Sequence, residues 1–296
     1  MGIMDNAPLV SIGLPVFNGA MYIQHALDSL LAQSYANFEL NISDNASTDG
    51  TEEICRVYAA KDPRVHYYRH AHNVGFMGNW RRALQLAAGE YFMWTAHDDC
   101  WSMHYIGTLL ECLLACPGAI LAAGRTLYID VDGHPHPRAD PDDAPVRHGN
   151  GNLSIAKQLL QQHAAQGWVH GLFRRDDLLR LVPMFFAADP WGADVIFMLE
   201  LCLRNAIVGS DAAVLYKRVT GGVSGPKTAR QRVKWQCWFA GALLPVIRQS
   251  SLSTKEKREV FHAYVLYLKW LYFRHGIFSW AKLWSRAGFD WLIGMD

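Results

Sequence analysis

Long uninterrupted apolar runs are missing from this 296-residue chain, although 51% of its residues are hydrophobic. A helix that crosses a bilayer needs about 20 consecutive apolar residues, so the sequence argues against a membrane-spanning protein. The six cysteines form no zinc-type doublets, and no secretory signal opens the chain. We therefore expect reduced, buried thiols in a cytoplasmic protein.

Charged residues are also few, at 19%, and a net charge of +1 conceals an uneven distribution. Residues 217–296 hold 14 Lys and Arg against 4 Asp and Glu, whereas residues 1–216 hold 14 against 23. An acidic body without a recognisable nucleic-acid module argues against nucleic-acid binding, despite the basic tail.

Strand-like and helix-like segments alternate through the first hundred residues. Residues 9–16, 38–42 and 65–68 have the composition of buried strands, and helical apolar spacing follows each of them. This alternation predicts an α/β fold with a parallel sheet. Beyond residue 100, helices are expected at 105–116, 175–181 and 195–203, and strands at 119–123, 127–131, 169–173 and 213–219.

The most informative stretch is the strand predicted at residues 91–96, which leads directly into His97, Asp98 and Asp99. Ligands bind at the carboxyl ends of strands in an open α/β sheet, so these acids are well placed to hold a divalent cation and, through it, a phosphate. Taken alone, an Asp pair after a strand is more often a turn or a helix cap. The surrounding motifs must decide between the two.

Two regions leave alternatives open. In the Pro-, Asp- and Gly-rich residues 134–152, His134 and His136 could bind a metal, but a mobile, solvated loop is the better interpretation. Residues 226–296 are basic, are predicted to be mostly helical and contain six of the eleven Trp residues. Such helices either lie on an anionic membrane surface or pack in a helical bundle against the catalytic domain or a second subunit.

Four motifs over residues 8–225 resemble, in order and spacing, those of the family 2 inverting glycosyltransferases. The resemblance implies a GT-A fold, which is a Rossmann-like, mostly parallel sheet flanked by helices, here with a C-terminal helical region. The motifs are residues 14–19, residues 43–51, residues 73–91 with Asn73, Gly75, Asn79 and Gly89, and the triplet His97, Asp98, Asp99.

The resemblance also implies roles for single residues. Its nucleotide-sugar site would include Pro15, Phe17, Asn18, Asp44 and Asn73. Asp99 would hold Mn²⁺ or Mg²⁺, and Asp98 would contact ribose or phosphate or support the metal site. His97 replaces the first acid of the family's triplet, which puts the strength of metal binding in question.

The same resemblance implies roles for two further residues, Asp194 and Arg218. Asp194 would be the general base that takes the proton from the acceptor hydroxyl, with Asp189 as the second choice; an acid at a helix start is the alternative reading. Arg218 would meet the diphosphate, with Ser224 less securely, although Thr220 and Gly221 stand where relatives carry a His. As an alternative, Arg218 is a surface cation.

The resulting hypothesis is a cytoplasmic, metal-dependent inverting glycosyltransferase that uses a nucleotide-diphosphate sugar. Its catalytic domain would span residues 1–225, with the nucleotide-sugar half at 8–100 and the acceptor half at 101–225. The acceptor would be a saccharide or a lipid-linked saccharide of a surface polysaccharide, reached at the inner face of the membrane. A non-catalytic scaffold with the same fold is the alternative, and a nucleotidylyltransferase is disfavoured because residues 15–18 lack its Gly-rich loop. The sequence is compatible with an oligomer.

Overall fold

The computed structural model describes residues 7–136, 145, 152–162, 165–187, 193–204, 206–220, 241–242 and 244–273. Within this part of the chain no helix is long and apolar enough to cross a membrane.

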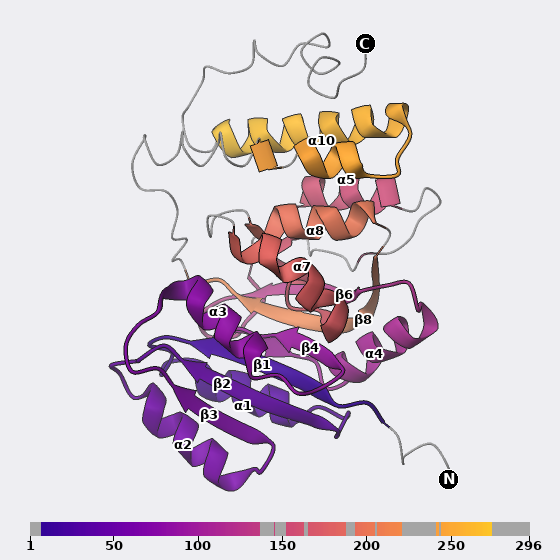
Figure 1. Ribbon diagram of the computed structural model, residues 1–296. Helices are drawn as coiled ribbons and strands as arrows, with labels where there is room; N and C mark the ends of the chain where they lie inside the picture. Colours follow the sequence, from indigo (N-terminus) through magenta and orange to yellow (C-terminus); the bar gives the residue numbers. More distant parts are fainter. Residues whose placement is uncertain are drawn as a thin grey trace.

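The first half is a run of strand–helix units, as predicted (Figure 1). All seven residues of the first strand are buried, which is the pattern of a parallel strand with helices on both faces. The elements are β1 (Val10–Val16), α1 (Ile23–Leu31), β2 (Phe38–Asp44), α2 (Thr51–Lys61), β3 (Val65–Arg69), α3 (Gly75–Gln85) and β4 (Tyr91–Trp94).

The second half completes the sheet and adds helices on both faces of it. Its elements are β5 (Cys100–Trp101), α4 (Tyr105–Ala115), β6 (Leu121–Ile129), α5 (Asn152–Gln162), α6 (Ala165–Trp168), β7 (Leu172–Arg174), α7 (Arg175–Ala187), α8 (Ala193–Leu203), β8 (Ile207–Arg218) and α10 (Thr254–Phe273).

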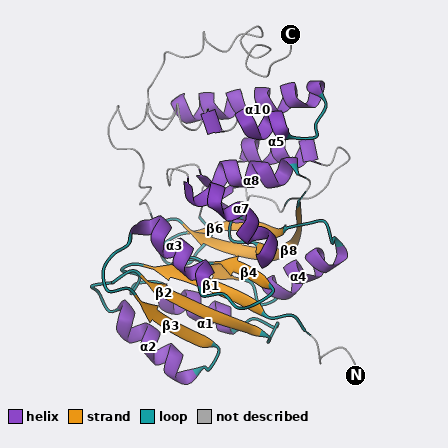
Figure 2. Ribbon diagram, viewed as in Figure 1, coloured by secondary structure: helices purple, strands orange, loops and turns teal. Residues whose placement is uncertain are grey.

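The strands form one eight-stranded sheet in the order β3-β2-β1-β4-β7-β6-β8-β5. The pairs β1–β2, β1–β4, β2–β3 and β6–β8 are parallel, and the other three pairs are antiparallel. The fold is thus a mixed α/β sheet flanked by helices (Figure 2). Because β1, β2 and β4 are parallel, their carboxyl ends meet at one edge, where the acids predicted for the site follow.

Two hydrophobic cores lie on the two faces of this sheet. Alternate side chains of β4 enter different cores: Phe92 and Trp94 belong to the core that also contains residues of α5, α8 and α10, whereas Tyr91 and Met93 belong to the core that contains residues of α1 and α4. A helix layer therefore covers each face, and the loops at the strand ends are left to carry the site.

Three details differ from the sequence-based expectation. The two strands predicted at 119–123 and 127–131 are one strand, β6, with a register irregularity between Gly124 and Arg125. A side chain at Gly124 would place its Cβ 2.2 Å from the carbonyl oxygen of Ala213, so the backbones approach more closely than any other residue allows. Neither β5 nor α5 was predicted, because β5 has two residues and α5 follows a Pro- and Gly-rich stretch.

The C-terminal helix α10 packs against α5 and shares a core with it. Val260 and Tyr264 of α10 are fully buried there. This face of the helix thus matches the bundle alternative, while Leu266 remains exposed on the same helix. The domain boundary at residue 225 lies in undescribed chain and stays a prediction.

Candidate functional site

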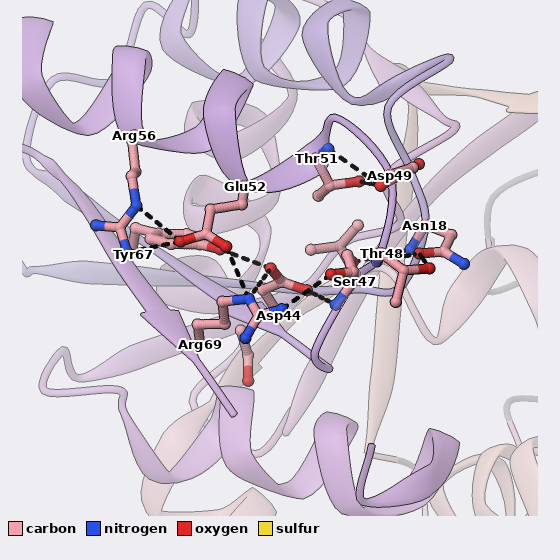
Figure 3. Close-up of polar contacts among 12 residues, drawn as sticks. Asn18, Asp44, Ser47, Thr48, Asp49, Thr51, Glu52, Arg56, Tyr67 and Arg69 are labelled. Atoms are coloured by element: carbon pink, nitrogen blue, oxygen red, sulfur yellow. Dashed lines mark hydrogen bonds and ion pairs between the residues drawn. The ribbon is translucent and has the colours of Figure 1, made fainter. Parts of the chain in front are cut away.

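Asp44, the acid at the end of β2, lies in a network of polar side chains, which is called the Asp44 pocket below (Figure 3). Its carboxylate is fully buried; Oδ1 accepts the backbone N–H of Ser47 at 2.9 Å, and Oδ2 accepts the hydroxyl of Tyr67 at 2.6 Å. The guanidinium of Arg69 lies 3.7 Å from Oδ2 and makes a second ion pair with Glu52 at 3.0 Å. Neighbouring strands β2 and β3 thus fix the orientation of this carboxylate.

The loop after β1 is fastened to the loop after β2. The backbone N–H of Asn18 donates to Ser47 Oγ, and Asn18 Oδ1 accepts the N–H of Thr48 at 2.8 Å. Asn18 has a φ of 51°, a left-handed conformation that Asn tolerates better than most residues. These bonds set Asn18 beside the Asp44 pocket.

A buried asparagine on α3 ties the same two strand ends together. Asn79 Nδ2 donates to the carbonyls of Val16 and Ser43, and its Oδ1 accepts the Ser43 hydroxyl. Close by, Asn73 Oδ1 accepts from Asn45 Nδ2 at 2.9 Å. The structure therefore brings Asn73 to the side of the pocket that Asp44 and Asn18 occupy.

The loop after β4 carries the acid pair and touches the loop after β1. Gly19 faces the ring of His97 so closely that an added Cβ would lie 2.6 Å from His97 Cδ2. Burial, and then the charge of neighbouring Asp99, raises the pKa of the Asp98 carboxyl. Asp99 is buried, and its Oδ1 accepts the backbone N–H of Arg218 at 2.9 Å.

The short strand β5 explains how Asp99 reaches the end of β8. Cys100 pairs with Tyr216 in an antiparallel ladder, so the residue before Cys100 faces the residues after Tyr216. From the end of β8, the guanidinium of Arg218 bonds to the backbone of two neighbouring loops. Its Nε donates to the carbonyl of Asp98 at 3.0 Å, and its Nη1 donates to the carbonyls of Asp130 and Val131. Its role toward a diphosphate stays a prediction.

On the other side of β8, the ammonium of Lys217 lies 3.6 Å from Asp99 Oδ2. The positive charge of Lys217 also lowers the pKa of Asp194, at the start of α8, although burial is the larger effect and raises it. His170 lies in the same neighbourhood, and burial followed by the Lys217 charge lowers its pKa to about 4. The structure thus sets Lys217 beside Asp99, and the charge of this lysine also acts on Asp98 and Asp194.

His170 is a neutral side chain with a defined tautomer. Its Nδ1 lies 3.0 Å from the carbonyl oxygen of Trp94, and because a carbonyl only accepts, Nδ1 carries the proton. The bond anchors the end of β4, just before the acid pair. Sequence reasoning missed His170, which is an isolated residue without a local motif, and it gave the role at the end of β8 to Arg218 and none to Lys217.

The acid pair fits a divalent cation. Asp99 Oδ2 is buried without a hydrogen-bond partner, and carboxylate oxygens are the ligands that Mg²⁺ and Mn²⁺ prefer. Asp98 offers a second carboxylate beside it. A separate group, Asp130, Asp132 and His134, brings its ligand atoms within 4.8 Å of one another in a turn that is mostly exposed.

The remaining predicted residues are spread around this edge. Pro15 is buried within β1, and Phe17 is exposed at 44% in the loop that follows. Asp189 and Ser224 lie outside the described residues, as do most of residues 134–152.

Comparisons with known proteins place these features in a family. The sequence profile of glycosyl transferase family 2 matches residues 11–180, which is more than half of the chain. An uncharacterized glycosyltransferase of Rickettsia typhi is 40% identical over 252 residues, covering 84% of this chain and 76% of its own length. A Bacillus subtilis glycosyltransferase, whose name assigns it provisionally to teichuronic acid biosynthesis, is 34% identical over 128 residues, or 43% of this chain and 50% of its own.

Solved structures share the fold. TarS of S. aureus in complex with UDP-GlcNAc superposes with a TM-score of 0.62 at 16% identity, over 94% of this chain and 75% of that one. A mannosyltransferase of Pyrobaculum calidifontis in complex with GDP-Man and Mn²⁺ gives 0.57 at 19% identity, over 89% and 70%.

Proposed function

The chain belongs to glycosyl transferase family 2, and on that premise we propose that it moves a sugar from a nucleoside-diphosphate sugar to an acceptor hydroxyl with inversion at the anomeric carbon. One observation carries the proposal. A buried carboxylate with an oxygen that accepts no hydrogen bond, Asp99, forms an ion pair with Lys217, and the charge of this lysine also reaches a half-buried candidate base, Asp194.

Asp99 would hold Mn²⁺ or Mg²⁺ through Oδ2, with Asp98 as a second ligand or as a partner of ribose or phosphate. A bound cation of this kind neutralises the negative charge that grows on the departing diphosphate. The backbone N–H of Arg218 fixes the carboxylate by bonding to Oδ1, and Oδ2, which accepts no hydrogen bond, would bind the metal.

Asp194 would be the general base. Burial raises the pKa of its carboxyl, which brings the group closer to the pH at which a base both stays ionised and accepts a proton readily. Its place at the start of α8 allows the carboxylate to approach the acceptor hydroxyl from a rigid element. The proton of that hydroxyl would pass to Asp194 as the oxygen attacks the anomeric carbon.

The nucleotide would occupy the loops after β1, β2 and β3. Asp44 would contact the base, but both of its oxygens already have partners, Ser47 and Tyr67. Recognition of the nucleobase would therefore also involve the partners of Asp44, the Ser47 backbone and the Tyr67 hydroxyl. Asn18 and Asn73 flank the same pocket and would complete it.

The acceptor is proposed from the names of the relatives and from composition. The Bacillus subtilis relative is assigned to teichuronic acid biosynthesis, and an Escherichia coli relative, 35% identical over 107 residues, to colanic acid biosynthesis. We extend the proposal to a saccharide or lipid-linked saccharide of a surface polysaccharide. Such an acceptor would be met in the cytoplasm, with the basic residues 226–296 against the inner face of the membrane.

A nucleotide screen tests the donor and the metal together. UDP, GDP, dTDP and CDP are titrated by calorimetry, with and without Mn²⁺, into wild type, Asp99→Asn and Asp194→Asn. We expect tight binding of one nucleotide that requires both Mn²⁺ and Asp99, whereas Asp194→Asn keeps binding and loses turnover of the matching sugar nucleotide.

Two results would contradict the proposal. If no nucleotide binds under any condition, the chain keeps the fold without the chemistry, which is the scaffold alternative. If Asp194→Asn turns over the donor at the wild-type rate, the base lies elsewhere. The membrane part falls separately if the intact chain fails to bind vesicles that contain anionic lipid.

A further inference from the structure

Two cations stand side by side at the end of β8, and they face opposite sides of the sheet. Successive side chains of a strand alternate between its faces. Arg218 points toward α1, where its guanidinium lies 4.8 Å from the ring centre of Tyr22 and bonds to backbone carbonyls. Lys217 points toward Asp99 Oδ2, 3.6 Å from its ammonium, and its charge also reaches Asp194.

Lys217 meets these acids without a hydrogen bond of its own in the described part of the chain. Its ammonium is 3.6 Å from Asp99 Oδ2, which is an ion-pair distance but too long for a hydrogen bond. The side chain is 22% exposed, so its charge is only partly screened by water.

The oxygen that Lys217 approaches is therefore the one that a metal ion would need. We propose that Lys217 is a positioning residue that serves as the counter-ion of Asp99 in the metal-free enzyme and competes with the divalent cation for Asp99 Oδ2. This inference rests on the proposed function, because the competing cation is the metal proposed there.

A consequence is that metal and nucleotide bind together. With Lys217 in place, a dication that enters alone meets a unit positive charge beside its ligand. A nucleoside diphosphate brings negative charge that offsets the lysine, so each ligand strengthens the binding of the other. Free metal would then bind weakly, and metal with nucleotide would bind well.

Mn²⁺ binding measured by electron paramagnetic resonance, with and without UDP or GDP, tests this directly. The variants are Lys217→Met, which removes the charge and keeps the length, and Lys217→Arg, which keeps the charge. Lys61→Met, at the exposed end of α2, is the matched control. We expect Lys217→Met to bind Mn²⁺ alone at least about tenfold more tightly, since a charge a few ångströms away acts strongly at low dielectric.

The other expected results follow from charge alone. Lys217→Arg and Lys61→Met should stay near wild type, and in Lys217→Met the gain in Mn²⁺ affinity caused by nucleotide should shrink. A merely structural lysine would give the opposite sign, because a damaged site binds metal more weakly. Lys217→Gln repeats the test, and circular dichroism confirms that each variant is folded.

Equal or weaker Mn²⁺ binding by folded Lys217→Met and Lys217→Gln would overturn the inference, and so would Mn²⁺ binding by neither wild type nor variant. The proposed function is judged separately by turnover of sugar nucleotides. Tighter Mn²⁺ binding by Lys217→Met in a chain that turns over no donor would support the inference and refute the proposed function.

Discussion

Replacing Arg218 by Met should cost stability before it costs nucleotide affinity. The side chain is 7% exposed, and its guanidinium donates to three backbone carbonyls, those of Asp98, Asp130 and Val131. A hydrogen bond from a charged donor contributes about 1.5–3 kcal/mol. Since neighbouring bonds are not additive, we expect a loss of about 3–5 kcal/mol in the free energy of unfolding.

Urea denaturation measures this loss. With a slope of about 3 kcal/mol per molar urea, the midpoint of Arg218→Met should fall by about 1 M or more. Arg180→Met is the control, because Arg180 is 76% exposed in its pair with Asp177 and such surface pairs contribute about 0–1 kcal/mol. Calorimetry with the preferred nucleotide, below the unfolding transition, reports on binding.

The reasoning is refuted if Arg218→Met unfolds at the wild-type midpoint and loses nucleotide binding. Arg218 would then serve the diphosphate, as its family resemblance implies, and the three carbonyl contacts would carry little energy. Loss of both properties in proportion would mean that the guanidinium does both.

Three further changes have defined outcomes. Asp194→Asn should lower kcat by about 10²–10⁴-fold at unchanged nucleotide affinity. Burial raises the pKa of the Asp194 carboxyl in the folded protein above its value in the unfolded chain. The stability that this carboxyl contributes is therefore present below the unfolded-state pKa and is lost as pH rises through the folded-state pKa. In urea titrations at pH 5 and pH 8, the free energy of unfolding of Asp194→Asn should rise relative to that of wild type as the pH increases. Gly19→Ala should weaken nucleotide binding, because the added Cβ would lie 2.6 Å from His97 Cδ2 and 2.7 Å from Val16 Cγ2. His97→Ala removes only the first of these contacts and should restore part of the affinity. Gly50→Ala, with its nearest neighbour atom at 3.8 Å, should change little, and an equal loss in both Gly variants would contradict the clash. Tyr67→Phe should weaken nucleotide binding roughly 3–10-fold by freeing Asp44 Oδ2, and unchanged affinity would exclude that role.

Local sequence patterns predicted the first half of the fold, in which each strand and the helix that follows it are neighbours in the sequence. β1 to β4 and the helices between them are βα units, in which periodicity and strand-end polar residues are read from neighbouring positions. The acid pair could be placed at the carboxyl edge for the same reason, because parallel strands end together.

The other half depends on contacts that no short window contains. Asp99 and Arg218 meet across 119 residues through β5, a strand of two residues with no signal of its own. Lys217 and Arg218 differ in their contacts because they lie on opposite faces of β8: Arg218 bonds to backbone carbonyls, and Lys217 lies beside Asp99. The register of β8 determines which residue lies on which face, and a short sequence window does not contain that register.

The position of α10 limits how this chain can be divided. α10 packs on α5, and α5 packs on α8, so Figure 1 shows three helices stacked outward from the sheet. Cutting the chain at residue 225 would strip the cover from α5 and expose a buried apolar surface. The outer helix α10 is thus a structural part of the domain that positions Asp194. Because only α5 lies between α10 and α8 in this stack, a ligand that binds α10 could affect α8 through a single intervening helix.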